Sequence, residues 1–435
     1  MPRARVVAGS YERFVFGYGV ADDGPAGAPA LEKCFTVDAH AASVRCVAAS
    51  GGFAASGGGD DLIRVYHVDE EGGMANLGTL VGHEGDARAL AFHAPRGRAP
   101  TRLLSGGGDG SVRVWDVRDN FNALKTMRAH RGGVCSIAVH RSGRVALTSG
   151  NDSHVAMWDM GKGRVAFKCK TPDRVDKLAF TSEGNEYVSL TTQRLSVTDV
   201  EAGNIVRTYA TPSKALTFET RGRFSYVGCE GGDVLVYDAR VENAVGRIVK
   251  AHPQRVRGLA FASMTLEEAE DTSEARLLIS AGSEGAVRVW DLRSAVSASG
   301  DAAATPTTEL VTGARYTCLC SMPSENPPEA PEPKAPAATS KTEKKSHVSD
   351  AKQNSKPEAK QQKKKVMAKD DDFEVVPLKD EPAGKRAASR FDSDSDDDAP
   401  FAKPSGMGKK RDGAYEKSAT AARRKMHGIK KKSRR

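Results

Sequence analysis

The sequence has no apolar run of about 18 residues, which is the length that a membrane-spanning helix needs. Its N-terminus also lacks the apolar core of a signal peptide, because charged residues such as Arg5 and Glu12 and several glycines interrupt it. We therefore expect no membrane association and a location in the nucleus or the cytoplasm.

Cysteine is scarce and is not arranged for chemistry. The seven cysteines are an odd number, and no two of them form a Cys-x-x-Cys pair, so free thiols in a reducing compartment are the simplest interpretation. The sequence also lacks a glycine-rich phosphate loop and any His, Cys and carboxylate cluster with metal-ligand spacing. We expect no cofactor, no metal and no enzymatic activity.

Net charge is missing from the longer first part of the chain. Residues 1–320 hold 37 Lys or Arg and 37 Asp or Glu, so residues 321–435 hold the remaining 28 basic and 19 acidic residues and the whole net charge of +9. Large apolar residues become rare after Cys320, where Pro, Ala, Lys, Glu and Ser dominate. We predict a folded domain over residues 1–320 and a disordered acidic and basic tail over residues 321–435.

The folded part contains a repeat. An aromatic residue or its substitute, followed in most copies by Asp, recurs 39 to 53 residues apart at Tyr66, Trp115, Trp158, Thr198, Tyr237 and Trp290. Gly-His or Ala-His precedes four of these units, at His40, His83, His130 and His252. Such dipeptides at a period of about 40 to 45 residues are typical of WD-repeat propellers, in which each repeat supplies four short strands.

The strand pattern predicts how the ring of repeats closes. Innermost strands are expected to begin near Val44, Ala87, Val134, Val175, Ala215, Val256 and Tyr316. No further strands follow residues 316–320, whereas runs at residues 6–10, 14–18 and 34–37 precede the first complete unit. We predict an all-β, seven-bladed WD40 β-propeller whose seventh blade joins one C-terminal strand to three N-terminal strands. This closure pairs sheet edges that would otherwise promote aggregation.

Four units carry polar residues at a spacing that lets a His, a hydroxyl, an acid and an aromatic side chain bond one another. The predicted sets are His40, Ser56, Asp60 and Tyr66; His83, Ser105, Asp109 and Trp115; His130, Thr148, Asp152 and Trp158; and His252, Ser280, Glu284 and Trp290. A His-Asp-Ser catalytic site is the alternative, but recurrence in four blades favours a structural chain that satisfies its own buried donors. Thr192 and Gly231 replace the acid in the fourth and fifth units, which we expect to be the least rigid.

Arg45, Arg88 and Arg257 each follow the His of their unit by five residues. In a propeller this position opens the innermost strand, near the centre of the face formed by the His-bearing loops. Two interpretations remain open. The arginines pair with nearby acids such as Asp86, or they form a cationic patch for an acidic peptide or an RNA phosphate, which the planar guanidinium binds in two places.

The tail ends in a strongly basic segment. From Lys403 onward there are 13 basic and two acidic residues, and the final cluster contains Arg423, Arg424, Lys425, Lys430, Lys431, Lys432, Arg434 and Arg435. Such clusters are typical of nuclear or nucleolar targeting and of arms that contact nucleic-acid phosphates. Ser393 and Ser395 stand in an acidic run and are candidate phosphorylation sites.

Three stretches resemble one specific family. Residues 7–17, 125–147 and 313–319 are similar to the WD-repeat proteins known as p21-activated-kinase-interacting proteins, and the resemblance spans residues 6–320. It implies a nucleolar, non-catalytic factor for assembly of the large (60S) ribosomal subunit and rRNA processing. The implied partners are pre-ribosomal proteins and assembly factors, with pre-rRNA contact through the tail.

Other functions would use the same propeller, because a fold does not determine a function. Some members of this family are described as inhibitors of a p21-activated kinase, which makes a signalling adaptor one alternative. A ubiquitin-ligase substrate adaptor is another. The polybasic end favours ribosome assembly over both, since it has no evident use in either.

Overall fold

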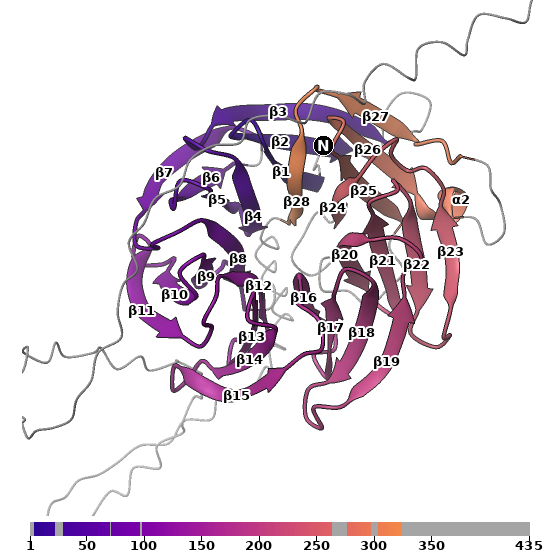
Figure 1. The fold of residues 1–435 in the computed structure, drawn as a ribbon. Coiled ribbons are helices and arrows are strands. Elements are labelled where there is room, and N and C mark those ends of the chain that lie inside the picture. The colour runs from indigo at the N-terminus through magenta and orange to yellow at the C-terminus, as the bar shows by residue number, and fades with distance from the viewer. Residues whose placement is uncertain are drawn as a thin grey trace, which may run out of the picture. The chain divides into compact units, whose positions relative to one another are not determined.

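The computed structural model describes residues 4–21, 29–69, 71–95, 98–262, 276–296 and 303–323. Within these residues the strands form seven four-stranded antiparallel sheets. Figure 1 shows the sheets arranged as blades around a common centre, with strands such as β8 and β16 innermost and β11 and β15 at the rim. The predicted seven-bladed β-propeller is therefore confirmed.

Each blade runs from an innermost strand to a rim strand in chain order, except the seventh. Blades 1 to 3 contain β4 (Val44–Ser50), β5 (Phe53–Gly58), β6 (Ile63–Val68) and β7 (Met74–Leu80); β8 (Ala87–His93), β9 (Arg102–Gly107), β10 (Ser111–Asp116) and β11 (Asn122–Arg128); and β12 (Val134–Val139), β13 (Val145–Gly150), β14 (His154–Asp159) and β15 (Arg164–Lys170). Blades 4 to 6 contain β16 (Lys177–Phe180), β17 (Glu186–Leu190), β18 (Arg194–Asp199) and β19 (Ile205–Ala210); β20 (Ala215–Arg221), β21 (Phe224–Cys229), β22 (Val234–Asp238) and β23 (Ala244–Ile248); and β24 (Val256–Phe261), β25 (Leu277–Gly282), β26 (Ala286–Asp291) and β27 (Thr308–Val311).

The seventh blade joins the two ends of the propeller. It is ordered β28 (Tyr316–Met322), β1 (Ala4–Ser10), β2 (Phe14–Ala21) and β3 (Ala30–Asp38). β28 and β1 pair antiparallel, and the hydroxyls of Tyr18 and Tyr316 bond each other across the junction. Nearby, the Arg315 Nε lies 2.6 Å from the Glu12 carboxylate. The predicted closure by one C-terminal and three N-terminal strands is confirmed.

Apolar side chains fill the joints between neighbouring blades. The described residues contain seven such clusters, one for each adjacent pair. Trp158 packs between blades 2 and 3, and Trp290 packs between blades 5 and 6. The smallest cluster has five buried residues and joins blades 3 and 4, where β16 is only four residues long. Hydrophobic burial thus holds every joint of the ring, least extensively between blades 3 and 4.

A few boundaries differ from the expected ones. β16 begins at Lys177 rather than near Val175, and it lacks the register shift that follows the first residue of β12. β28 continues to Met322, two residues past the predicted domain boundary at 320.

A short helix, α2 (Leu292–Ala295), follows β26 and is capped by the Asp291 side chain, which accepts a hydrogen bond from the Arg293 backbone N–H. No helix among the described residues is long and apolar enough to cross a membrane.

Candidate functional site

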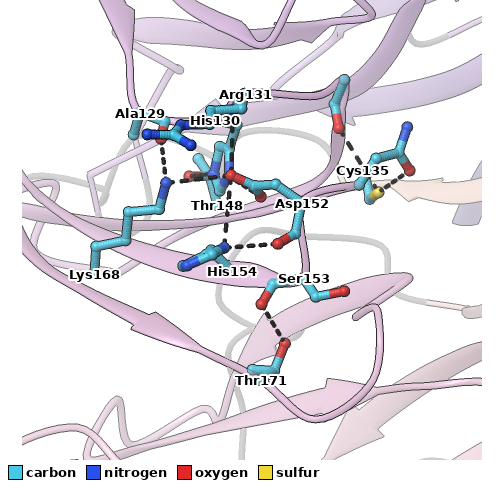
Figure 2. A network of polar contacts seen from close by, with 12 residues as sticks. Ala129, His130, Arg131, Cys135, Thr148, Asp152, Ser153, His154, Lys168 and Thr171 are labelled. Carbon is cyan, nitrogen blue, oxygen red and sulfur yellow. Dashed lines mark hydrogen bonds and ion pairs between the residues drawn. The ribbon is translucent and has the colours of Figure 1, made fainter.

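The polar set of blade 3 forms one continuous hydrogen-bonded chain. Trp158 Nε1 donates to Thr148 Oγ1 at 2.9 Å, and this oxygen lies 2.8 Å from His130 Nε2. On the other side of the ring, His130 Nδ1 lies 3.0 Å from Asp152 Oδ1, and the Arg131 backbone N–H donates to Asp152 Oδ2 (Figure 2). This network indicates a neutral imidazole, which donates a hydrogen bond from Nδ1 and accepts one from the threonine hydroxyl at Nε2.

The other three predicted sets have the same connectivity, with local variation. His40 Nε2 lies 2.8 Å from Ser56 Oγ and His40 Nδ1 lies 2.9 Å from Asp60, while the Tyr66 hydroxyl reaches Ser56 at 3.5 Å. His83 Nε2 lies 2.8 Å from Ser105 Oγ, to which Trp115 Nε1 also donates a hydrogen bond. The Nδ1 atom of His83 lies 3.4 Å from Asp109 but closer, at 3.1 Å, to Ser111 Oγ. His252 bonds Ser280 at 2.7 Å and Glu284, and Trp290 donates to Ser280 at 2.8 Å.

The neutral imidazoles and the buried hydroxyls indicate that these sets have a structural role. Burial lowers the pKa of His40, His83 and His130, although their acidic partners oppose the shift, so the imidazoles are neutral at pH 7. The hydroxyls of Ser56, Ser105, Thr148 and Ser280 belong to side chains with no exposed surface. A nucleophile without access to solvent cannot attack a substrate, so the geometry opposes the catalytic alternative.

A glycine beneath each His is a part of the sets that the spacing argument missed. A Cβ atom on Gly58, Gly107, Gly150 or Gly282 would lie 2.3 to 2.4 Å from the Nδ1 atom of the histidine in the same blade. That distance is far inside van der Waals contact, so only glycine lets the imidazole reach its acidic partner.

In blades 4 and 5 the histidine, the glycine and the acid of the polar set are all replaced by other residues. The glycine position holds Leu190 in blade 4 and Cys229 in blade 5, and both side chains are fully buried. The position four residues before the predicted innermost strand, which is His in the other units, holds Thr171 and Thr211. The repeated Thr-Pro dipeptide at 171–172 and 211–212 is the sequence signal that identifies the substitution.

A basic side chain supports the loop before the histidine in three blades. Arg113 donates to the Gly82 carbonyl and Arg288 to the Ala251 carbonyl, each at 2.5 Å. In blade 3 the matching residue of β14 is Ala156, and its cross-strand neighbour Lys168 donates instead to the Ala129 carbonyl, also at 2.5 Å. In these three blades a cation therefore supports the loop, and blade 3 supplies it from the rim strand.

The three predicted arginines lie at the start of innermost strands β4, β8 and β24, each within a register shift of the first strand pair. Arg45 Nε lies 3.4 Å and Arg88 NH2 lies 3.6 Å from the same Asp86 carboxylate oxygen. Arg257 forms no comparable ion pair among the described residues, and its neighbour Arg255 pairs with Glu230 at 2.9 Å. The structure thus pairs two of the three arginines with one shared acid, which leaves the group positively charged.

Several sequence-based expectations concern other parts of the chain. The basic cluster from Arg423 to Arg435 and the candidate phosphorylation sites Ser393 and Ser395 lie outside the described residues. All seven cysteines lie within them and are free thiols, but only Cys229 is buried and the others are partly exposed. No group of His, Cys and carboxylate side chains within the described ranges could hold a metal ion.

Known proteins resemble this chain over a third to about three quarters of its length. The family model for the WD domain, G-beta repeat, matches residues 31–67, 74–116 and 121–159. A p21-activated protein kinase-interacting protein 1-like protein of Danio rerio is 31% identical over 340 residues, which cover 77% of this chain and 85% of the relative. The p21-activated protein kinase-interacting protein 1 of Homo sapiens is 26% identical over 72% of this chain and 76% of its own length. Protein MAK11 of Saccharomyces cerevisiae is 28% identical over 33% of this chain and 38% of its own length.

Proposed function

Because this chain belongs to the p21-activated protein kinase-interacting protein 1-like family of WD-repeat proteins, we propose that it is a non-catalytic assembly factor for the large ribosomal subunit. It acts in the nucleolus, where it supports rRNA processing as a scaffold for pre-ribosomal proteins and other assembly factors. WD-repeat propellers are in general binding scaffolds, and the buried hydroxyls of the polar sets agree with that role.

The observation that carries the proposal is the contrast between the two parts of the chain. Residues 1–320 are electrically neutral, whereas the segment from Lys403 onward carries 13 basic and only two acidic residues. A polybasic end suits nucleolar targeting and salt-sensitive contact with pre-rRNA phosphates. Only Tyr415 offers an aromatic ring near this cluster, so base stacking adds little to the contact.

The face around Arg45, Arg88 and Arg257 is the proposed docking face of the propeller. Together with Arg174 and Arg255 these residues form five arginines near the centre of the ring, whereas Asp86, Asp176 and Glu230 supply three carboxylates. The excess of two positive charges stands out against an otherwise neutral domain. An acidic segment of a partner protein or an RNA phosphate would meet a planar guanidinium there.

Sedimentation of a cell extract tests the function. The full-length protein is expected to migrate with precursor large subunits, and migration only as a small free complex would refute the proposal. Replacing Arg45, Arg88 and Arg257 together with Glu is expected to abolish this co-migration without lowering the thermal midpoint. If the folded triple variant still co-sediments normally, the arginine face is not the docking site.

A second function is favoured by the names of the relatives, which are described as interacting with a p21-activated protein kinase. The two functions separate in one experiment with purified components. Inhibition of a p21-activated kinase by the isolated protein, at a concentration near that of the kinase, would support a signalling role. If the protein does not inhibit the kinase but does co-sediment with precursor large subunits, only the role in ribosome assembly is supported.

A further inference from the structure

A second cationic site lies on blade 3 and is formed by residues other than Arg45, Arg88 and Arg257. An open pocket of about 780 Å³ is lined by Arg131, Asp152, His154, Lys168 and Lys170. Figure 2 shows that His154 on β14 and Lys168 on β15 point toward Asp152, and that the Arg131 backbone N–H reaches it from the loop before β12. The pocket is therefore lined by three permanent cations, those of Arg131, Lys168 and Lys170, and by one carboxylate.

The fold accounts for Lys168 and for His154, whose Nδ1 lies 2.6 Å from the Asp152 backbone carbonyl, but not for the charges of Arg131 and Lys170. Lys168 takes over the carbonyl contact that arginines make in blades 2 and 6. His154 and Lys170 form a cross-strand pair at the same end of the blade. The corresponding pair in blade 6 is Ala286 and Val311, beside an intact polar set, so the set does not require charge at these positions.

The carboxylate in the pocket is already engaged. Asp152 accepts hydrogen bonds from His130, the Arg131 backbone N–H and Lys168, at 3.0, 3.2 and 3.2 Å, and lies 3.7 Å from His154 Nδ1. Partial burial acts to raise the pKa of Asp152, but these hydrogen bonds hold that pKa well below its usual range. One negative charge against Arg131, Lys168 and Lys170 leaves an excess of two positive charges before His154 is counted.

We propose that this pocket binds the backbone phosphates of an RNA strand. The five lining side chains are all ionisable, four of them basic and one acidic, which suits phosphate contact rather than the apolar anchoring that most peptide sites use. Recognition is then independent of base sequence and falls steeply with salt. The inference rests on the proposed function for its biological setting, since it gives the neutral propeller a contact with RNA separate from the tail.

Fluorescence anisotropy with the full-length protein and a labelled oligouridylate of about 16 nucleotides tests the site. Arg131 and Lys170 are exposed and are the residues to change, because Lys168 also supports the fold. The double variant R131A/K170A is expected to reduce the slope of log affinity against log salt by about 1.4, which is two phosphate contacts on a single strand. The basic tail is unchanged in every variant, so its contribution cancels.

Lys162 and Arg164 provide a matched control. They are exposed, carry the same charge and lie at the other end of the same blade, where β15 begins. The variant K162A/R164A is expected to keep the wild-type slope. Equal slopes for R131A/K170A and the wild type, with unchanged thermal midpoints, would overturn the proposal.

An acidic protein segment is the competing ligand, and a labelled peptide of residues 390–400 represents it. Binding of this peptide that depends on Arg131 and Lys170, without a matching change in RNA binding, would also overturn the RNA assignment. These measurements use purified protein, so they are independent of sedimentation. A failed RNA test leaves the assembly role intact, and failed co-sedimentation leaves the RNA result intact.

Discussion

Blade 2 and blade 5 occupy equivalent places in the ring but fill the same space in two ways. In blade 2, His83 needs Gly107 beneath it and an acid, Asp109, beside it. In blade 5 the three corresponding positions are Thr211, Cys229 and Gly231. The smaller Thr is matched by a larger residue at the glycine position, and the acid disappears with its histidine partner.

The difference shows that the polar set is replaced as a unit. Removing the histidine alone would leave an orphaned carboxylate and an empty space, and each costs free energy of folding. Blade 5 avoids both, although the Thr211 hydroxyl is buried without a hydrogen-bond partner among the described groups. The Tyr237 hydroxyl, at the aromatic position, bonds the Ala210 carbonyl rather than a side chain.

The largest effect is expected from opening the ring, on which both kinds of blade depend. Deletion of residues 1–20 removes β1 and most of β2, so that β28 and β3 lose their partners. We expect insoluble or protease-sensitive protein because two sheet edges become exposed. A soluble deletion variant with an unchanged thermal midpoint would contradict the closure as a source of stability.

The next largest effect concerns the glycine rule. Gly107→Cys places a Cβ atom 2.4 Å from His83 Nδ1 and 2.5 Å from Asp109 Oδ1, so we expect a loss of about 3 kcal/mol in the free energy of unfolding. On a His83→Thr background, which imitates blade 5, the same change should cost at least about 1 kcal/mol less. Urea denaturation of the four proteins of this cycle gives the coupling. A coupling near zero would show that the two positions vary independently.

A smaller effect distinguishes the acids of the two blades. Asp109 accepts hydrogen bonds from Ser111 and the Glu84 backbone N–H beside His83, whereas Asp233 accepts one from the Lys250 backbone N–H. Asp109→Ala should therefore lower the free energy of unfolding by about 1 to 3 kcal/mol, and Asp233→Ala by less. Denaturant melts that show equal losses would contradict the special role of the set.

Most of the fold was predictable because its signals are local and repeated. The aromatic residue, the histidine and the turn residues of each unit fix strands of a known period, and Tyr18 kept that period into the N-terminal strands. The glycine rule was not predictable from spacing, because it depends on the approach of Gly107 to a residue 24 positions earlier. The blade 3 pocket was missed for a similar reason: Arg131 and Lys170 come together only through the pairing of β14 with β15 and the loop before β12.

The smallest effect is a pH dependence that the buried histidines should produce. Burial lowers the pKa of His40, His83 and His130, and burial together with Arg102 lowers the pKa of His93 to about 4. The unfolded chain then binds more protons than the folded chain once the pH falls below about 6.5, the ordinary histidine value. The contribution of these histidines to stability is therefore complete above that pH and decreases as the pH falls toward 4.

His83→Gln should make the free energy of unfolding fall less steeply between about pH 7 and pH 5, by at most about 1.4 kcal/mol per pH unit. Thr211→Val in blade 5 should change the stability without changing this slope, because threonine does not titrate. An identical slope for wild type and His83→Gln, measured by urea denaturation at several pH values, would mean that His83 takes up its proton equally in the folded and unfolded chains.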